Sequence, residues 1–215
     1  MSHLLRIALP DVPGSLGAVA SALGEAGVNI EAIEIVEHRA DGVAIDDFFI
    51  RLSPGVMPDA AVSSVMRFDD VEVLWVSRYP TAGNLYLDLE AVELIAQQPV
   101  IAHEVLTEIL PRTFRGDWAM VAARDGEQVR SVCATPGAPE ISDECGAWFP
   151  LETADRLAAP RSWGSTLLGA APLGSPERII VFGRHGGPEI LSSELARLAH
   201  LATLAASIER PAPRR

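Results

Sequence analysis

Apolar residues in the first 80 positions alternate between strand-like and helix-like spacing. Residues 4–9 are a short apolar segment typical of a buried strand. The next apolar residues recur at helical spacing: Leu16, Val19, Ala20 and Leu23. Asp11 is placed to cap this predicted helix, Pro13 suits its start, and Gly27 is placed to end it.

The pattern then returns to two strands, a helix and a last strand. These elements are predicted over 29–38, 43–52, 58–66 and 71–77. The alternation slips once between Ala32 and Ile33, which indicates a bulge, and Asp41-Gly42 is typical of a hairpin turn. The resulting order, βαββαβ, predicts a ferredoxin-like α+β domain.

From residue 85 onward the pattern predicts a second α+β region. Its helices are expected over 85–96, 100–110, 153–158 and 193–209, and its strands over 118–123, 128–133, 166–171 and 178–182. Ser193 is placed to cap the last helix, which either covers its own domain's sheet or supplies a dimer contact. The stretch 79–84, rich in Pro, Gly and Asn, indicates a linker, so we predict domains over 1–80 and 81–215 with a disordered tail from 210.

Composition and charge limit the classes of partner. The chain has 215 residues, 29 acidic against 17 basic, and a net charge of −12, so we expect no nucleic-acid and no membrane partner. Every basic residue is Arg, which excludes lysine Schiff-base and P-loop lysine chemistry. The first residues lack the pattern of a secretory signal, and Cys133 and Cys145 form no cysteine framework. We therefore expect a cytoplasmic protein with free thiols.

The sequence contains parts of several enzyme motifs, but each lacks a required residue. His103-Glu104 lacks the second histidine of a zinc-protease motif, because residue 107 is Thr. No G-x-S-x-G elbow accompanies the glycines after His185. Asp46 and Asp47 are adjacent in a predicted strand, where neighbours face opposite ways and cannot act as a carboxylate pair. We expect no catalytic domain, no metal and no cofactor; an enzyme with an unrecognised site in residues 84–209 stays open.

The strongest local signal is a loop between the first predicted strand and helix. It reads Asp11, Val12, Pro13, Gly14, Ser15 and Leu16. A helix start presents unpaired N–H groups and partial positive charge, which together favour a carboxylate, while Asp11 can accept hydrogen bonds from an ammonium group. One loop would then meet both ends of an α-amino acid. The alternative is that Asp11 only caps the helix and the glycine only permits a turn.

These residues resemble an ACT domain, the small regulatory module of amino-acid-metabolic enzymes and transcription factors. The resemblance covers about residues 3–78, and its motif residues are Asp11, Pro13, Gly14, Leu16, Leu23, Gly27, Asn29 and Ile30. It implies domains that pair side by side through their sheets, with amino acids bound at the interface. By this resemblance residues 11–16 would hold the ligand, together with Asn29 and Ile30, which the partner subunit would supply.

The second region is similar to a GAF-type sensor domain over residues 84–209. The similarity rests on the layout of a helical lead-in, the 118–133 hairpin, the strand pair and the closing helix. It implies an antiparallel sheet flanked by helices. Trp118, Trp148 and Trp163 either line a cavity or pack as an aromatic core.

These features together predict a non-catalytic regulatory protein. We expect a homodimer that binds a small molecule, most simply an amino acid, at an ACT interface and allosterically signals that state to a protein partner. Two alternatives remain at this point. One is an assembly protein with a vestigial ligand site, and the other is the enzyme mentioned above.

Overall fold

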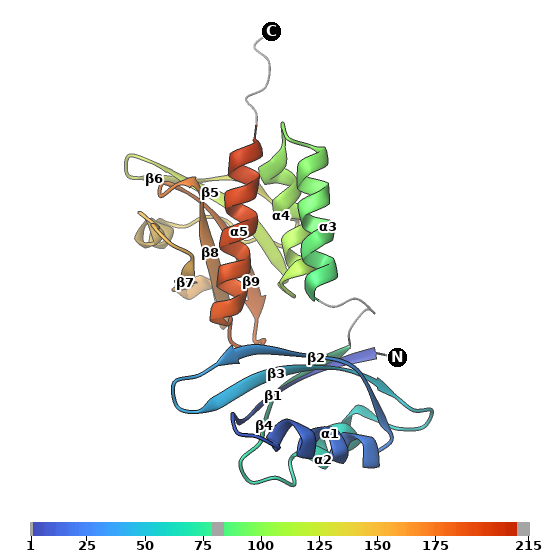
Figure 1. Cartoon of the computed structure of the whole chain (residues 1–215). Coiled ribbons are helices and arrows are strands. Elements are labelled where there is room, and N and C mark those ends of the chain that lie inside the picture. Colours follow the sequence, from blue (N-terminus) through green and yellow to red (C-terminus); the bar gives the residue numbers. More distant parts are fainter. Residues whose placement is uncertain (1, 79–83, 210–215) are drawn as a thin grey trace. The chain divides into compact units, whose positions relative to one another are not determined.

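The computed structural model describes residues 2–78 and 84–209. The chain divides into two compact units, residues 1–83 and residues 84–215 (Figure 1). The predicted domain boundary at 80/81 and the predicted disordered tail from 210 lie outside the described residues.

The first unit has the predicted βαββαβ order. Its elements are β1 (Ser2–Pro10), α1 (Ser15–Glu25), β2 (Val28–His38), β3 (Val43–Leu52), α2 (Pro58–Val65) and β4 (Glu72–Arg78). The strands form a four-stranded sheet in the order β2-β3-β1-β4, with antiparallel neighbours. The ferredoxin-like arrangement is confirmed, and β2 is an edge strand of this sheet.

Both helices of this unit cover one face of the sheet (Figure 1). Val19 and Leu23 of α1 join Ala61 and Val65 of α2 in a core that also takes in the sheet residues Leu5, Ile7, Phe48 and Ile50. These core residues recur at every second position of their strands, which places them on the helix face, whereas Leu4 and Phe49 lie on the opposite face with Trp75.

The bulge predicted in β2 is present, but at different positions. The register with β3 shifts between Ile30 and Ala32 and again between Ile35 and Glu37. Each shift inserts one extra residue, so Ile30, Ile33 and Ile35 stay opposite the helix-face residues of β3. The break in the apolar–polar alternation between Ala32 and Ile33 results from the extra residue at the first register shift.

The second unit is a five-stranded antiparallel sheet with helices. Its elements are α3 (Asn84–Gln97), α4 (Ala102–Thr113), β5 (Trp118–Asp125), β6 (Gln128–Ala134), β7 (Asp155–Leu157), β8 (Thr166–Ser175), β9 (Arg178–His185) and α5 (Ser192–Ile208), with short 3-10 helices at Asp143–Trp148 and Arg161–Trp163. The strand order is β6-β5-β9-β8-β7. The expected antiparallel sheet with flanking helices is confirmed.

One predicted helix of this unit is wrong. Residues 153–158 contain the short strand β7, which pairs with β8 through Asp155 opposite Ala170 and Leu157 opposite Leu168. The segment lies between Pro150 and Pro160. So short a segment is marginal as a helix, and pairing with an existing sheet edge satisfies its backbone instead.

The predicted cap of the last helix is also wrong, because α5 has Leu191 as its N-cap and begins at Ser192. The carboxylate of Glu194 accepts the N–H of Leu191 at 2.9 Å. The guanidinium of Arg184 donates to the same carboxylate at 2.7 Å. A buried ion pair from β9 therefore fixes the start of this helix, a contact that no local pattern shows.

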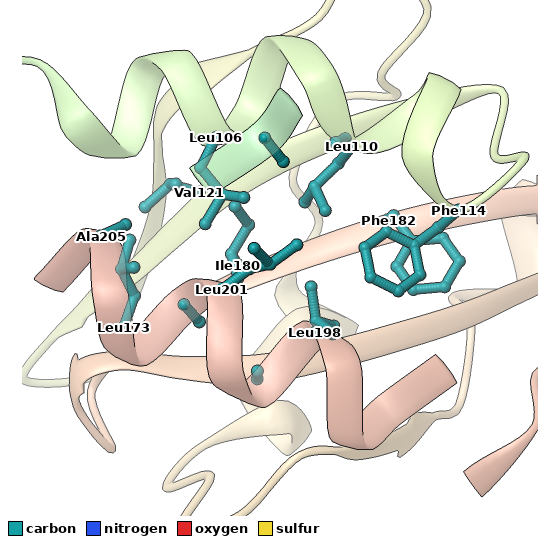
Figure 2. Packing of buried hydrophobic residues seen from close by; sticks show 14 of the residues in the cluster. Leu106, Leu110, Phe114, Val121, Leu173, Ile180, Phe182, Leu198, Leu201 and Ala205 are labelled. Atoms are coloured by element: carbon teal, nitrogen blue, oxygen red, sulfur yellow. The ribbon is translucent and has the colours of Figure 1, made fainter. Parts of the chain in front are cut away.

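The sheet of the second unit is packed on both faces. On one face α4 and α5 bury leucines against β5, β8 and β9, as Leu110, Val121, Ile180 and Leu201 show (Figure 2). On the other face Trp163 packs edge-on against Trp118 and Trp148, with centroids 5.4 Å and 5.5 Å apart, within a buried apolar cluster. The tryptophans are thus core residues, and α5 covers its own domain's sheet.

Candidate functional site

Helix α1 begins without a side-chain cap. Its N-cap residue is Gly14, whose backbone is left-handed with φ of 100°, and no side chain of the described residues bonds to the helix start. A Cβ here would meet no atom within 4 Å, so conformation rather than space requires the glycine. The expectation that Asp11 caps this helix is wrong, because Val12, Pro13 and Gly14 separate it from Ser15.

Asp11 forms hydrogen bonds with the β2–β3 hairpin and not with the start of α1. Its Oδ2 lies 2.8 Å from Nδ1 of His38, the last residue of β2. Its N–H donates to the carbonyl of Gly42 in the β2–β3 turn, also at 2.8 Å. Both side chains are exposed, so the Asp11 carboxylate is oriented by the hairpin yet accessible to a ligand.

The first turn of α1 keeps N–H donors that the helix itself does not use. Ser15 N–H bonds to the carbonyl of Val12 at 3.3 Å, and Ala18 N–H bonds to that of Gly14 at 2.9 Å. The N–H groups of Leu16 and Gly17 lie between them, at positions where helix geometry supplies no internal acceptor. With the helix dipole they favour a carboxylate, within the same loop as the Asp11 carboxylate.

The structure does not bring Asn29 and Ile30 to this loop within one chain. They lie at the start of β2 opposite Arg51 and Ile50, whereas His38 at its end lies opposite Ala44 beside the loop. A strand rises about 3.3 Å per residue, so roughly 25–30 Å separates the two ends of β2. Within one subunit, Asn29 and Ile30 are therefore remote from residues 11–16.

Asp46 is a charged residue of this region that the sequence did not single out as a binding residue. It lies on β3 opposite Ile7 and Ile35, on the helix face of the sheet, and is 2% exposed. Its Oδ1 is buried and has no hydrogen-bond partner among the described residues. Burial raises the pKa of Asp46 to about 6; the nearby charge of His38 lowers this pKa, while those of Asp11 and Asp47 raise it.

Comparison with known families identifies the first unit. Residues 3–62 match the model of the ACT domain family. The first unit is an ACT domain. No curated protein matches the chain in sequence. The ACT resemblance expected from the loop motif is thereby confirmed, and residues 11–16 are the β1–α1 loop of this ACT domain. We call this loop, together with His38 and Asp46, the loop site.

A structural comparison aligns GAF domains of known structure with part of the chain, at low sequence identity. A GAF domain from Pseudomonas syringae pv. tomato has a TM-score of 0.42 and 16% identity and covers 58% of this chain and 85% of that chain. The GAF domain from Acinetobacter phosphoenolpyruvate-protein phosphotransferase has a TM-score of 0.44 and 10% identity, with 59% and 93% covered. A GAF domain of A. Aeolicus in an inactive state has a TM-score of 0.43 and 12% identity, with 59% and 97% covered. The second unit's own sheet and helices give it the GAF-like fold expected from the sequence.

The two adjacent aspartates of the ACT domain lie on opposite faces of its sheet, as the strand pattern predicted. Asp47 lies opposite Arg6 and accepts two hydrogen bonds from its guanidinium, at 2.7 Å and 2.9 Å. This bidentate pair makes Asp47 a structural residue. Asp46 has no such cation opposite it in the register, since its neighbours across the sheet are isoleucines.

The GAF-like domain has a cleft of about 470 Å³ beside the β5–β6 hairpin. Its lining is mostly polar: Asp125, Glu127, Gln128, Val129, Arg130, Ile141, Ser142 and Asp143. A second, shallow groove of about 490 Å³ lies between the β8–β9 turn and the end of α5. Neither lining contains a histidine or a cysteine.

The two cysteines are free, Cys133 half-buried and Cys145 buried. Burial raises the pKa of the Cys133 thiol, although its hydrogen bond with Thr107, 3.4 Å between Sγ and Oγ1, acts in the opposite direction. A raised pKa keeps the group as the unreactive thiol. Cys145 is buried in the tryptophan cluster. Across residues 2–78 and 84–209, no three His, Cys, Asp or Glu side chains are grouped for a metal ion, and no helix is long and apolar enough to cross a membrane.

Proposed function

We propose that this chain is a non-catalytic regulatory protein that binds an amino acid at the interface of two ACT domains. The ligand-bound state is passed on to a protein partner. ACT and GAF-like domains are both regulatory modules that bind small molecules. In this proposal the small molecule is an amino acid, and its site is the ACT interface. It supposes no metal and no cofactor.

The observation that carries the proposal is the uncapped start of α1 beside an oriented Asp11. An α-amino acid has one carboxylate and one ammonium group a few bonds apart. The N–H groups of Leu16 and Gly17 suit the carboxylate, and the acidic side chain beside them suits the ammonium. A simple capping role for Asp11 is not available, because its carboxylate bonds to His38.

The edge position of β2 supports an interface at this site. An unpaired edge strand can extend its sheet by pairing with another strand. If two copies of β2 pair antiparallel, the start of one strand lies beside the end of the other. Asn29 of the partner subunit would then lie beside His38 and the loop, which removes the separation found within one chain.

A ligand held between two subunits stabilises the paired state by its differential affinity. At a concentration one hundred times its Kd, a ligand adds about 2.7 kcal/mol to folded-state stability. We therefore expect at least one of the twenty amino acids, at millimolar concentration, to raise the melting temperature of the whole chain by several degrees. Differential scanning fluorimetry measures this.

The matched control is Asp11→Ala, which removes the expected ammonium acceptor and should abolish the shift. Asp59→Ala changes an exposed carboxylate of α2 and should leave the shift intact. If no amino acid stabilises the wild type, the proposal fails. The assembly protein with a vestigial site, or an enzyme using the 470 Å³ cleft, then takes its place.

A further inference from the structure

The ACT domain buries a carboxylate oxygen for which the described residues provide no hydrogen bond. Asp46 is 2% exposed, and its Oδ1 has no partner among the described residues. Leaving a buried charged acceptor unsatisfied costs free energy, so such a group calls for a partner such as a ligand, an ion, a water molecule or a proton. The fold of the isolated domain gives no structural reason for a carboxylate rather than an apolar side chain at this position.

The direction from which a ligand would reach Asp46 follows from the sheet. His38 lies opposite Ala44, and Asp46 lies two positions further along β3, so both side chains are on the helix face. The charges of His38 and Asp11 both act on the Asp46 carboxyl group, which places it within electrostatic reach of the loop. Asp47 also acts on it but faces the other side with Arg6. The polar groups that face Asp46 are thus Asp11 and His38.

Exposed apolar residues lie next to Asp46 in the sheet and next to Asp11 in the loop. Ile35 lies directly opposite Asp46 on the edge strand and is 52% exposed, although it belongs to the helix face. Val12 in the loop is 58% exposed. An exposed aliphatic residue next to each of these two carboxylates fits a ligand with a charged end and an apolar side chain.

We propose that Asp46 binds the ammonium group of the ligand and that the loop site takes amino acids with an aliphatic side chain. This inference rests on the proposed function and adds a residue and a ligand class to it. The carboxylate of the ligand binds at the start of α1, its ammonium lies between Asp46 and Asp11, and its side chain contacts Ile35 and Val12. His38 keeps Asp11 oriented through their hydrogen bond.

The first test compares ligands on the wild-type chain by isothermal titration calorimetry. The probes are L-leucine, L-serine and 2-hydroxy-4-methylpentanoate, which replaces the ammonium of leucine by a hydroxyl. We expect L-leucine to bind at least tenfold more tightly than either of the others. The preference for leucine over the hydroxy acid should increase from pH 5 to pH 8, because Asp46 must ionise to pair with the ammonium.

The second test uses Asp46→Asn, which keeps the size of the side chain and removes its charge. We expect it to bind L-leucine at least tenfold more weakly and to lose the preference over the hydroxy acid. The control Asp59→Asn makes the same change at an exposed carboxylate beyond the other end of β3 and should bind as the wild type does.

The outcomes separate the two proposals. If Asp46→Asn keeps wild-type affinity and preference, the ammonium role is overturned while amino-acid binding stands. If the wild-type chain binds leucine and the hydroxy acid with equal affinity, the ammonium role is also overturned. This comparison needs no variant, so it holds even if Asp46→Asn does not fold. Tighter binding of L-serine than of L-leucine overturns the aliphatic ligand class. If none of the twenty amino acids binds the wild type, the proposed function itself fails.

Discussion

At the scale of a residue, the burial of Asp46 affects the stability of the protein as well as its ligand. Its pKa is raised to about 6 from an ordinary value of 3.8. Between these pH values the folded state holds a proton that the unfolded state has released, so the free energy of unfolding falls as pH rises. A shift of this size corresponds to about 3 kcal/mol. Above pH 6 the ionised Asp46 carboxylate therefore lowers the free energy of unfolding by this full amount.

We expect Asp46→Asn to remove this pH dependence and to raise the free energy of unfolding at pH 8 by up to about 3 kcal/mol. Urea denaturation without ligand, at pH 4, 6 and 8, measures the difference between variant and wild type. The difference should be small at pH 4 and grow toward pH 8. A variant less stable than the wild type at pH 8 would contradict the account of Asp46 as an unsatisfied buried charge.

At the scale of an element, the start of α1 depends on one backbone conformation. Gly14 has a φ of 100°, which costs an L-residue about 1–2 kcal/mol, whereas Gly24 near the end of the same helix has open space around it and no positive φ. The N-cap glycine and the glycine near the helix end therefore differ in what a methyl group would do.

We expect Gly14→Ala to lower the free energy of unfolding by about 1–2 kcal/mol and to weaken amino-acid binding, because the loop must move. Gly24→Ala is the control and should raise stability by about 0.5–1 kcal/mol, since alanine is the better helix former. Urea denaturation and calorimetry measure both effects. Equal effects of the two substitutions would show that the conformation of Gly14 is not what holds the loop.

At the scale of the whole molecule, the question is whether ligand binding and subunit pairing are linked. The loop lies at one end of β2, and Asn29 and Ile30 lie at its opposite end, so under the proposed function they join the loop site only from the β2 strand of a second ACT domain. We expect the dimer dissociation constant, measured by analytical ultracentrifugation, to fall as L-leucine is added. In Asp11→Ala this constant should not depend on leucine. A ligand that binds without changing the wild-type constant occupies a site within one subunit.

Much of the fold could be predicted because its signals are local. The alternation in 43–52 and the glycine after Asp41 specify β3 and its turn, and the structure has a strand over the same residues. The type of each element was predicted correctly where the hydrophobic pattern was long and periodic. The prediction failed at 153–158, where ten or so residues between two prolines carry too little local preference and pairing with β8 decides the conformation.

The sequence by itself determined the ACT domain, its β1–α1 loop and the opposite orientations of Asp46 and Asp47, because these follow from periodicity and turn residues within a few positions of each other. Only the tertiary structure decided that Asp11 bonds to His38 and that Asp46 is buried without a partner. Both depend on the register between strands distant in sequence, including two bulges in β2. Register is set by the packing of a whole face, and no short pattern contains it.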